Sequence, residues 1–196
     1  MFITRKFHIE RFLKIILAFL FLLLSVALLI AWNTPATGYE SSIYDSTPMI
    51  LWLSIVASVI VGASLVIFSI AKNELEERYL WKIGLLLILL SYIICLSLFI
   101  IRGYFMWCMS GDPSDHIGWI KETLNAGQVP TSLIYPITHI FVSEIVLFTG
   151  LDLIFLHKIV PLVFGILFIL FIYVFARVVF TKPSVSVLVT VISCCL

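Results

Sequence analysis

The sequence has few charged residues for its length. Only 12% of its 196 residues are Asp, Glu, Lys or Arg, whereas roughly 25% is typical of soluble globular proteins. The net charge of +1 offers no basic surface for nucleic acid. Because 62% of the residues are hydrophobic and the mean hydropathy is +1.19, the chain lacks the polar surface that a water-soluble fold needs. These shortages exclude a nucleic-acid-binding protein and indicate a membrane protein.

Cysteine is also scarce, and its spacing carries no metal signature. The four cysteines include no Cys-X-X-Cys pair. Cys95 lies in an apolar run, Cys108 precedes a polar loop, and Cys194 and Cys195 are near the end of the chain. Since this spacing does not match a zinc site, we interpret the cysteines as small apolar residues or as thiols that face lipid.

Long apolar runs predict four membrane-spanning helices. A helix rises about 1.5 Å per residue, so about 20 residues cross the ~30 Å hydrocarbon core of a bilayer. The first run is too long for the apolar part of a signal peptide and lacks a cleavage site of small residues, so we expect it to be retained. The predicted spans are 12–32, Met49–Ala71, Leu80–Ile101 and about Leu153–Val179.

The positions of Lys and Arg predict the orientation of these spans, because cytoplasmic loops are enriched in both residues. Four of them lie at or before the start of the first span, and the loop 33–47 has none. Lys72, Arg78 and Lys82 flank the connection between the second and third spans. We therefore expect a multi-pass protein of the cell membrane with a cytoplasmic N-terminus and an extracytoplasmic loop over 102–152.

Two apolar segments are too short or too polar to be assigned simply. Segment 132–150 carries Pro136, His139 and Glu144, and an ionisable residue in the bilayer costs ~2.5–3.5 kcal/mol. We expect it to lie at the outer membrane surface or against the bundle, with a further span as the alternative. The last run, 183–196, is marginal for a span, which predicts a truncated chain.

A polar stretch, SGDPSDHIGWIKETLNAG at 110–127, separates the third span from this segment. Asp112 followed by Pro113 is a favoured helix start, and Gly127 is a favoured helix end, so we predict a helix over 113–126. One side of this helix is apolar, as in helices that lie on a membrane surface. The residues on that side are Ile117, Ile120 and Leu124. A capped surface helix is therefore a complete, non-catalytic explanation of Asp112.

A second side of the same helix is polar, and a cap does not explain all of it. One acid is enough for a cap, but here two acids, a histidine and a tryptophan follow i, i+3, i+4, i+7 spacing. Such a group is suited to deprotonating a hydroxyl or binding a divalent cation, Mg²⁺ or Mn²⁺. Two or three ligands do not complete a metal site, so the cation is left open. The four residues are Asp112, Asp115, His116 and Trp119.

Other polar residues of the predicted outer face also have two interpretations. Arg102 is a candidate for neutralising a substrate phosphate. His139 and Glu144 are five residues apart, hence not close helical neighbours, and both substrate binding and simple exposure to water are open. His157 and Lys158 lie at the head of the fourth span, where anchoring at the interface explains them.

The stretches TPATGYESSIYDSTP and GDPSDHIGWIKETLNAGQVPTSLIYPITHI resemble parts of archaeal multi-pass membrane proteins that are similar to GT-C class glycosyltransferases. The resemblance covers the N-terminal half of such proteins and nearly all of this chain. It implies an all-α, polytopic transmembrane bundle with juxtamembrane helices in an outer loop. It also implies transfer of a sugar from a polyprenyl-phosphate donor to a lipid or protein acceptor on the outer face.

The resemblance assigns roles to particular residues. In that class an acidic residue of the first large outer loop is the catalytic base or binds a metal ion, which corresponds to Asp112, with Asp115 and His116 as catalytic neighbours. Residues 1–79 become a two-span extension, and 80–196 become the start of the core. Because family members continue through further spans, missing C-terminal spans or a partner subunit are implied, and this chain alone is expected to be inactive. The candidate substrate-binding residues, which come from the interpretation of the polar residues above, are Arg102, Trp119, His139 and Glu144.

Two functions of other classes remain open. A non-catalytic membrane scaffold or lipid-binding assembly partner would use the Asp112 region only as a capped surface helix. A transporter is disfavoured, because the first three spans have no ionisable residue near mid-bilayer and no inverted repeat is evident. No small-xxx-small face stands out among the spans, so the sequence predicts no oligomeric state.

Overall fold

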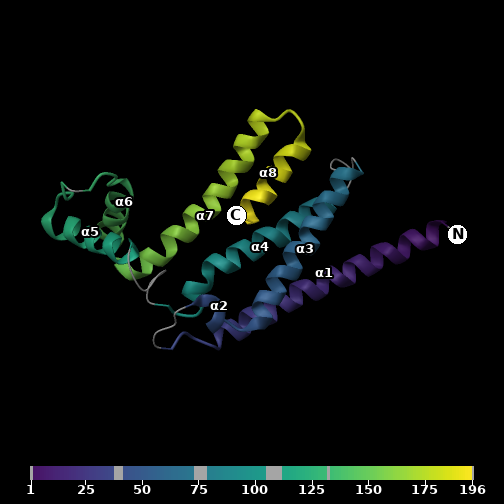
Figure 1. Cartoon of the computed structure of the whole chain (residues 1–196), viewed down its shortest axis with the longest axis horizontal. Helices are drawn as coiled ribbons and strands as arrows, with labels where there is room; N and C mark the ends of the chain where they lie inside the picture. The colour runs from purple at the N-terminus through teal and green to yellow at the C-terminus, as the bar shows by residue number, and fades with distance from the viewer. Residues whose placement is uncertain (1, 38–41, 73–78, 105–111, 132, 196) are drawn as a thin grey trace.

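A computed structural model describes residues 2–37, 42–72, 79–104, 112–131 and 133–195, with side chains described from Lys14 onward in the first helix and from Ser114 onward in the fifth. Within these ranges every regular element is an α-helix (Figure 1). The helices are α1 (Phe2–Trp32), α2 (Ile43–Ser46), α3 (Met49–Ala71), α4 (Leu80–Ile101), α5 (Asp112–Ala126), α6 (Ile137–Thr149), α7 (Leu153–Val179) and α8 (Pro183–Cys195).

Four helices in the described ranges are long and apolar enough to cross a membrane: Lys14–Trp32 within α1, then α3, α4 and α7. This confirms the predicted all-α bundle of membrane-spanning helices, and α3, α4 and α7 have the predicted limits. Helix α6 has 13 residues. At about 1.5 Å per residue it is about 20 Å long, short of a ~30 Å hydrocarbon core. It is therefore a short apolar helix beside the spans.

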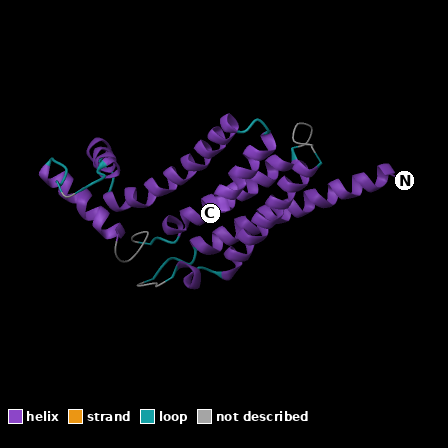
Figure 2. Ribbon diagram, turned by 45° about the horizontal axis from the view of Figure 1, so that its top comes forward, coloured by secondary structure: helices purple, strands orange, loops and turns teal. Residues whose placement is uncertain are grey.

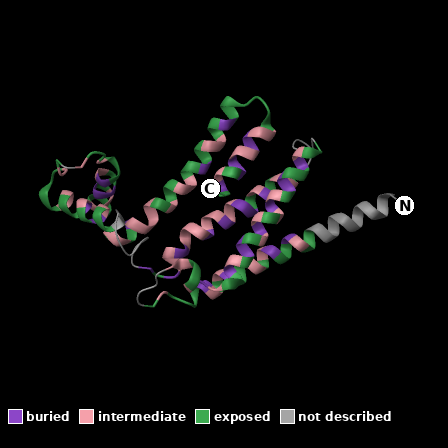
Figure 3. Cartoon of the chain, in the orientation of Figure 1, coloured by how far each residue is buried: buried purple, intermediate pink, exposed green. Residues whose placement is uncertain are grey.

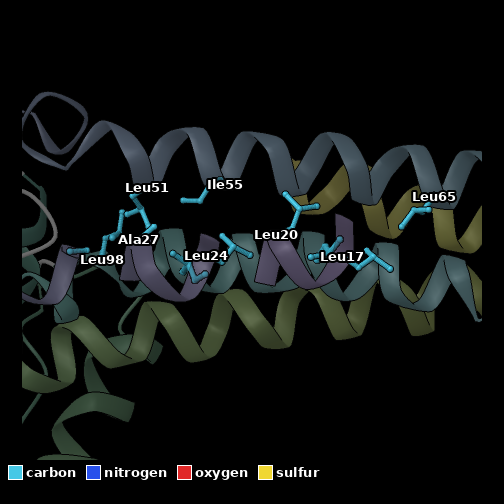
Figure 4. Close-up of a cluster of buried hydrophobic side chains, with 11 residues drawn as sticks. Leu17, Leu20, Leu24, Ala27, Leu51, Ile55, Leu65 and Leu98 are labelled. Carbon is cyan, nitrogen blue, oxygen red and sulfur yellow. The ribbon is translucent and has the colours of Figure 1, made fainter. Parts of the chain in front are cut away.

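Helix α4 is the centre of the bundle, since it contacts α1, α3, α7 and α8. Figure 4 shows the aliphatic core that α1, α3 and α4 share. Ala27 of α1, Leu51 of α3, and Leu87 and Leu98 of α4 have no exposed surface. Because lipid tails are as apolar as leucine, this core is stabilised by close packing of the side chains and not by their removal from water.

Two facing glycines bring α3 and α4 together. A Cβ on Gly62 would lie 2.6 Å from the carbonyl oxygen of Gly84, and a Cβ on Gly84 would lie 2.5 Å from that of Gly62. Ser54 and Ser58 precede Gly62 at intervals of four and are fully buried. Ser54 satisfies its hydroxyl within its own helix, on the Ile50 carbonyl at 2.5 Å, so it packs as a small residue. The expectation that no small-xxx-small face stands out was therefore wrong.

The connections divide between the two ends of the bundle (Figures 1 and 2). Helix α2 lies at the same end as the α5–α6 pair, whereas the last turn of α3, the first turn of α4 and the α7–α8 connection lie at the other end. The α5–α6 pair contacts the first turns of α7. The rest of α7 is exposed along most of its length (Figure 3), as expected of a helix that faces lipid.

Candidate functional site

The α5–α6 pair has its own small core against α7. Ile120 of α5, Val142 of α6 and Leu156 of α7 form a buried cluster, with Leu124 packed against it. Ile117 is buried as well, which confirms the predicted apolar side of α5. The backbone N–H of the residue after α5, Gly127, donates to the Thr123 carbonyl at 3.0 Å, and its φ is +67°. The predicted glycine end of this helix is therefore confirmed.

Two histidines from different helices meet on the polar side of α5. Nδ1 of His116 lies 2.6 Å from Nε2 of His139 on α6, and the rings stack with centroids 4.8 Å apart. Trp119, one turn after His116, stands at a steep angle to both imidazoles, with centroid distances of 5.3 and 5.5 Å. In such a pair one imidazole nitrogen donates and the other accepts, so protonation of both rings breaks the hydrogen bond.

Burial and the neighbouring His116 both favour the neutral form of His139. Only 1% of its surface is exposed. Burial lowers the pKa of His139 below its usual value, the nearby His116 lowers it further, and a backbone contact with Tyr135 partly opposes both. Nδ1 of His139 is buried and makes no hydrogen bond of standard geometry among the residues described, although the Tyr135 backbone is close enough to influence the ring.

A third histidine, His157 of α7, lies at the same place. His116, His139 and His157 line a cavity of about 200 Å³ between α5, α6 and α7. Nε2 of His157 is also buried without a partner in the described part of the chain. Pro161 lines the cavity too, and it has no N–H to donate to the carbonyl of His157 one turn earlier. The apolar and hydroxyl residues of the lining are Ile120, Thr138, Val142, Val160 and Pro161.

The sequence-predicted site residues are only partly brought together. His116, Trp119 and His139 form one cluster, whereas Asp115 and Glu144 are exposed. Helix α5 begins at Asp112, but the side chain of Asp112 lies outside the described residues, so its roles as cap, base or metal ligand stay predictions. Over the described residues no three His, Cys, Asp or Glu side chains are grouped to hold a metal ion.

Arg102, the other predicted substrate contact, is built into the bundle. Its side chain is 3% exposed. Nε donates to the Thr34 carbonyl at 2.9 Å, and Nη1 donates to the hydroxyls of Ser46, at 3.2 Å, and Tyr104. Its own carbonyl accepts from the N–H of Ala36 at 2.7 Å. Arg102 therefore ties the α1–α3 connection to the end of α4, and it does not line the histidine cavity.

Sequence reasoning missed His157 as a site residue, because its position at the head of a span is explained by anchoring. The available signal was weak: three of the four histidines fall within 116–157. No spacing rule predicts that α7 brings the third histidine against the other two.

Comparisons with protein-family models, with curated proteins and with solved structures gave no match. The site is therefore interpreted from its own chemistry. Ligand pockets for whole small molecules measure about 300–1,000 Å³, so a cavity of about 200 Å³ is suited to one polar head group. Its lining includes three imidazole rings and the hydroxyl residue Thr138, which are groups that pair with hydroxyls.

Proposed function

We propose that this chain is part of a membrane transferase that moves a sugar from a polyprenyl-phosphate donor to a lipid or protein acceptor. The observation that carries the proposal is the cavity of about 200 Å³ at the start of α7, which His116, His139 and His157 line together. A neutral imidazole has one nitrogen that donates and one that accepts a hydrogen bond, and sugar hydroxyls pair with both kinds of group.

The place of the cavity supports a lipid-linked substrate. The cavity lies at the first turns of α7, and α7 is long and apolar enough to span a membrane. A lipid-linked sugar has a matching arrangement: its lipid chain lies in the hydrocarbon, and its head group lies at the membrane surface. The exposed side of α7 (Figure 3) offers an apolar surface along which the polyprenyl chain can lie while the sugar contacts the histidines.

The reaction is a displacement at the anomeric carbon. An acceptor hydroxyl oxygen forms a bond to that carbon, the bond from the carbon to the phosphate oxygen breaks, and polyprenyl phosphate leaves with the electron pair. The hydroxyl proton passes to a base. We assign this role to Asp112, one helical turn before His116, and assign to the His116–His139 pair the positioning of the sugar beside it.

Ligand titration tests the proposal without requiring turnover. The full chain is placed in phosphatidylcholine nanodiscs with Trp119 as its only tryptophan, and its fluorescence is followed as a polyprenyl-phosphate hexose is added. Saturable binding is expected, with polyprenyl phosphate that lacks the sugar binding more weakly. Loss of one hydrogen bond is worth ~1 kcal/mol, so His157→Phe is expected to weaken binding about fivefold.

The matched control is Glu144→Gln, because Glu144 is exposed on α6 and does not line the cavity. This variant is expected to bind like the parent chain. If the sugar makes no difference to affinity, or if Glu144→Gln and His157→Phe weaken binding equally, the transferase proposal is wrong and a non-catalytic scaffold becomes the better account.

A further inference from the structure

A second and larger cavity lies between α4 and α7, in the part of the bundle away from the histidines. Its volume is about 390 Å³. Its walls are mainly aliphatic and aromatic side chains, and Thr190 of α8 lies in its lining. Among the described residues, the charged member of the lining is Lys82, in the first turn of α4. The cavity is therefore an apolar groove with one cation at one end.

The length of the groove corresponds to one leaflet of a bilayer. On α4 its lining runs from Trp81 and Lys82 to Ile93. At about 1.5 Å per residue, Lys82 and Ile93 are about 16 Å apart along the helix, close to half of the ~30 Å hydrocarbon core. A single acyl chain that enters beside Lys82 thus reaches the end of the groove near the middle of the membrane.

The basic side chains of the described residues at this end favour an anionic head group. Lys82 is exposed, and its Nζ lies 5.7 Å from the centroid of the Trp81 ring. Three further basic residues of this end, Lys72, Arg177 and Lys182, are also exposed. A Lys or Arg near the surface of an anionic leaflet contributes about 1 kcal/mol to binding. A phosphate that contacts Lys82 adds this electrostatic attraction to the favourable burial of the acyl chain in the groove.

We propose that the groove binds one anionic phospholipid from the leaflet on the Lys82 side. One acyl chain lies between α4 and α7, beside Leu89 and Leu170, and the phosphate lies at Lys82. In the predicted topology this is the cytoplasmic leaflet, where anionic lipids are concentrated. The proposal is independent of the transferase, since it uses neither the histidine cavity nor the α5–α6 pair.

Quenching of Trp81 by brominated lipids tests this directly. The full chain, with Trp81 as its only tryptophan, is placed in phosphatidylcholine vesicles that contain a small, equal fraction of dibrominated phosphatidylglycerol or dibrominated phosphatidylcholine. We expect phosphatidylglycerol to associate about fivefold more strongly, which corresponds to ~1 kcal/mol. Lys82→Gln is expected to remove this preference.

Lys182→Gln is the matched control, because Lys182 is exposed at the same end and is not part of the lining. It is expected to keep the preference. Equal quenching by both lipids would overturn the proposal in favour of unselective acyl packing. Equal loss in the two variants would overturn it in favour of general surface attraction, and an absence of quenching by either lipid would mean that protein occupies the groove.

Discussion

Nδ1 of His116 and Nε2 of His139 lie 2.6 Å apart, although 23 residues separate them in the chain and they belong to different helices. This bond joins α5 to α6 on the polar side of α5, beside a cavity that also includes His157 of α7. The bond holds α5 and α6 together next to the first turns of α7. The chemistry proposed for this protein depends on that arrangement.

Acidification is expected to destabilise the α5–α6 pair. The pKa of His139 is lowered in the fold from its ordinary value of 6.5, so the unfolded chain takes up a proton before the folded chain does. The free energy of unfolding is therefore highest above about pH 6.5 and falls as the pH drops through the folded pKa. Unfolding followed by Trp119 fluorescence measures this. His139→Phe should flatten the dependence, and an unchanged dependence in that variant would contradict the assignment.

Substitutions of Asp112 distinguish the transferase proposal from a non-catalytic scaffold. Asp112→Asn removes the proposed base, and general bases contribute typically 10²–10⁴-fold to rate. Transfer of labelled sugar, measured in membranes that also supply the implied C-terminal spans or partner subunit, should therefore fall by at least about 10²-fold. Asp112→Ser keeps a residue that caps helices well and should be equally inactive. Full transfer by Asp112→Ser would mean that Asp112 is only a cap.

The glycine contact between α3 and α4 is expected to be intolerant of added volume. Gly84→Ala places a Cβ against the Gly62 carbonyl oxygen, and overpacking of this kind costs typically ~1–3 kcal/mol. Thermal unfolding followed by circular dichroism in detergent measures the change. Gly118→Ala on α5 is the control, because a Cβ there meets nothing within 4 Å and helix propensity improves by up to ~1 kcal/mol. Equal stability of the two variants would contradict the close approach.

Arg102 is expected to act on stability and not on ligand affinity. Hydrogen bonds to charged groups contribute about 1.5–3 kcal/mol each, so Arg102→Ala, which leaves the Ser46 and Tyr104 hydroxyls without this donor, should lower the unfolding temperature clearly. The affinity of the folded variant for a polyprenyl-phosphate hexose should be unchanged. Arg177→Ala, at an exposed position in the last turn of α7, should alter neither. Weaker binding at unchanged stability would restore Arg102 as a phosphate ligand.

Composition and periodicity predicted the elements well and their assembly poorly. The limits of α3, α4 and α7 follow from the lengths of apolar runs, and the end of α5 follows from Gly127, because these features are local. The meeting of His116, His139 and His157 depends on how three helices pack, which no local pattern specifies. The bonds of Arg102 were missed for the same reason, since its partners lie on a connection 55 to 68 residues away.

The proposed function places the histidine cavity on the outer face of the membrane, and labelling of single cysteines in intact cells tests this most directly. A membrane-impermeant thiol reagent is applied to Ser114→Cys, Glu144→Cys and Thr181→Cys in a cysteine-free background; all three positions are exposed. The first two should be labelled from outside and Thr181→Cys protected, since the α7–α8 connection lies at the opposite end of the bundle (Figure 1). Labelling of Thr181→Cys with protection of Ser114→Cys would place the cavity in the cytoplasm and contradict the account.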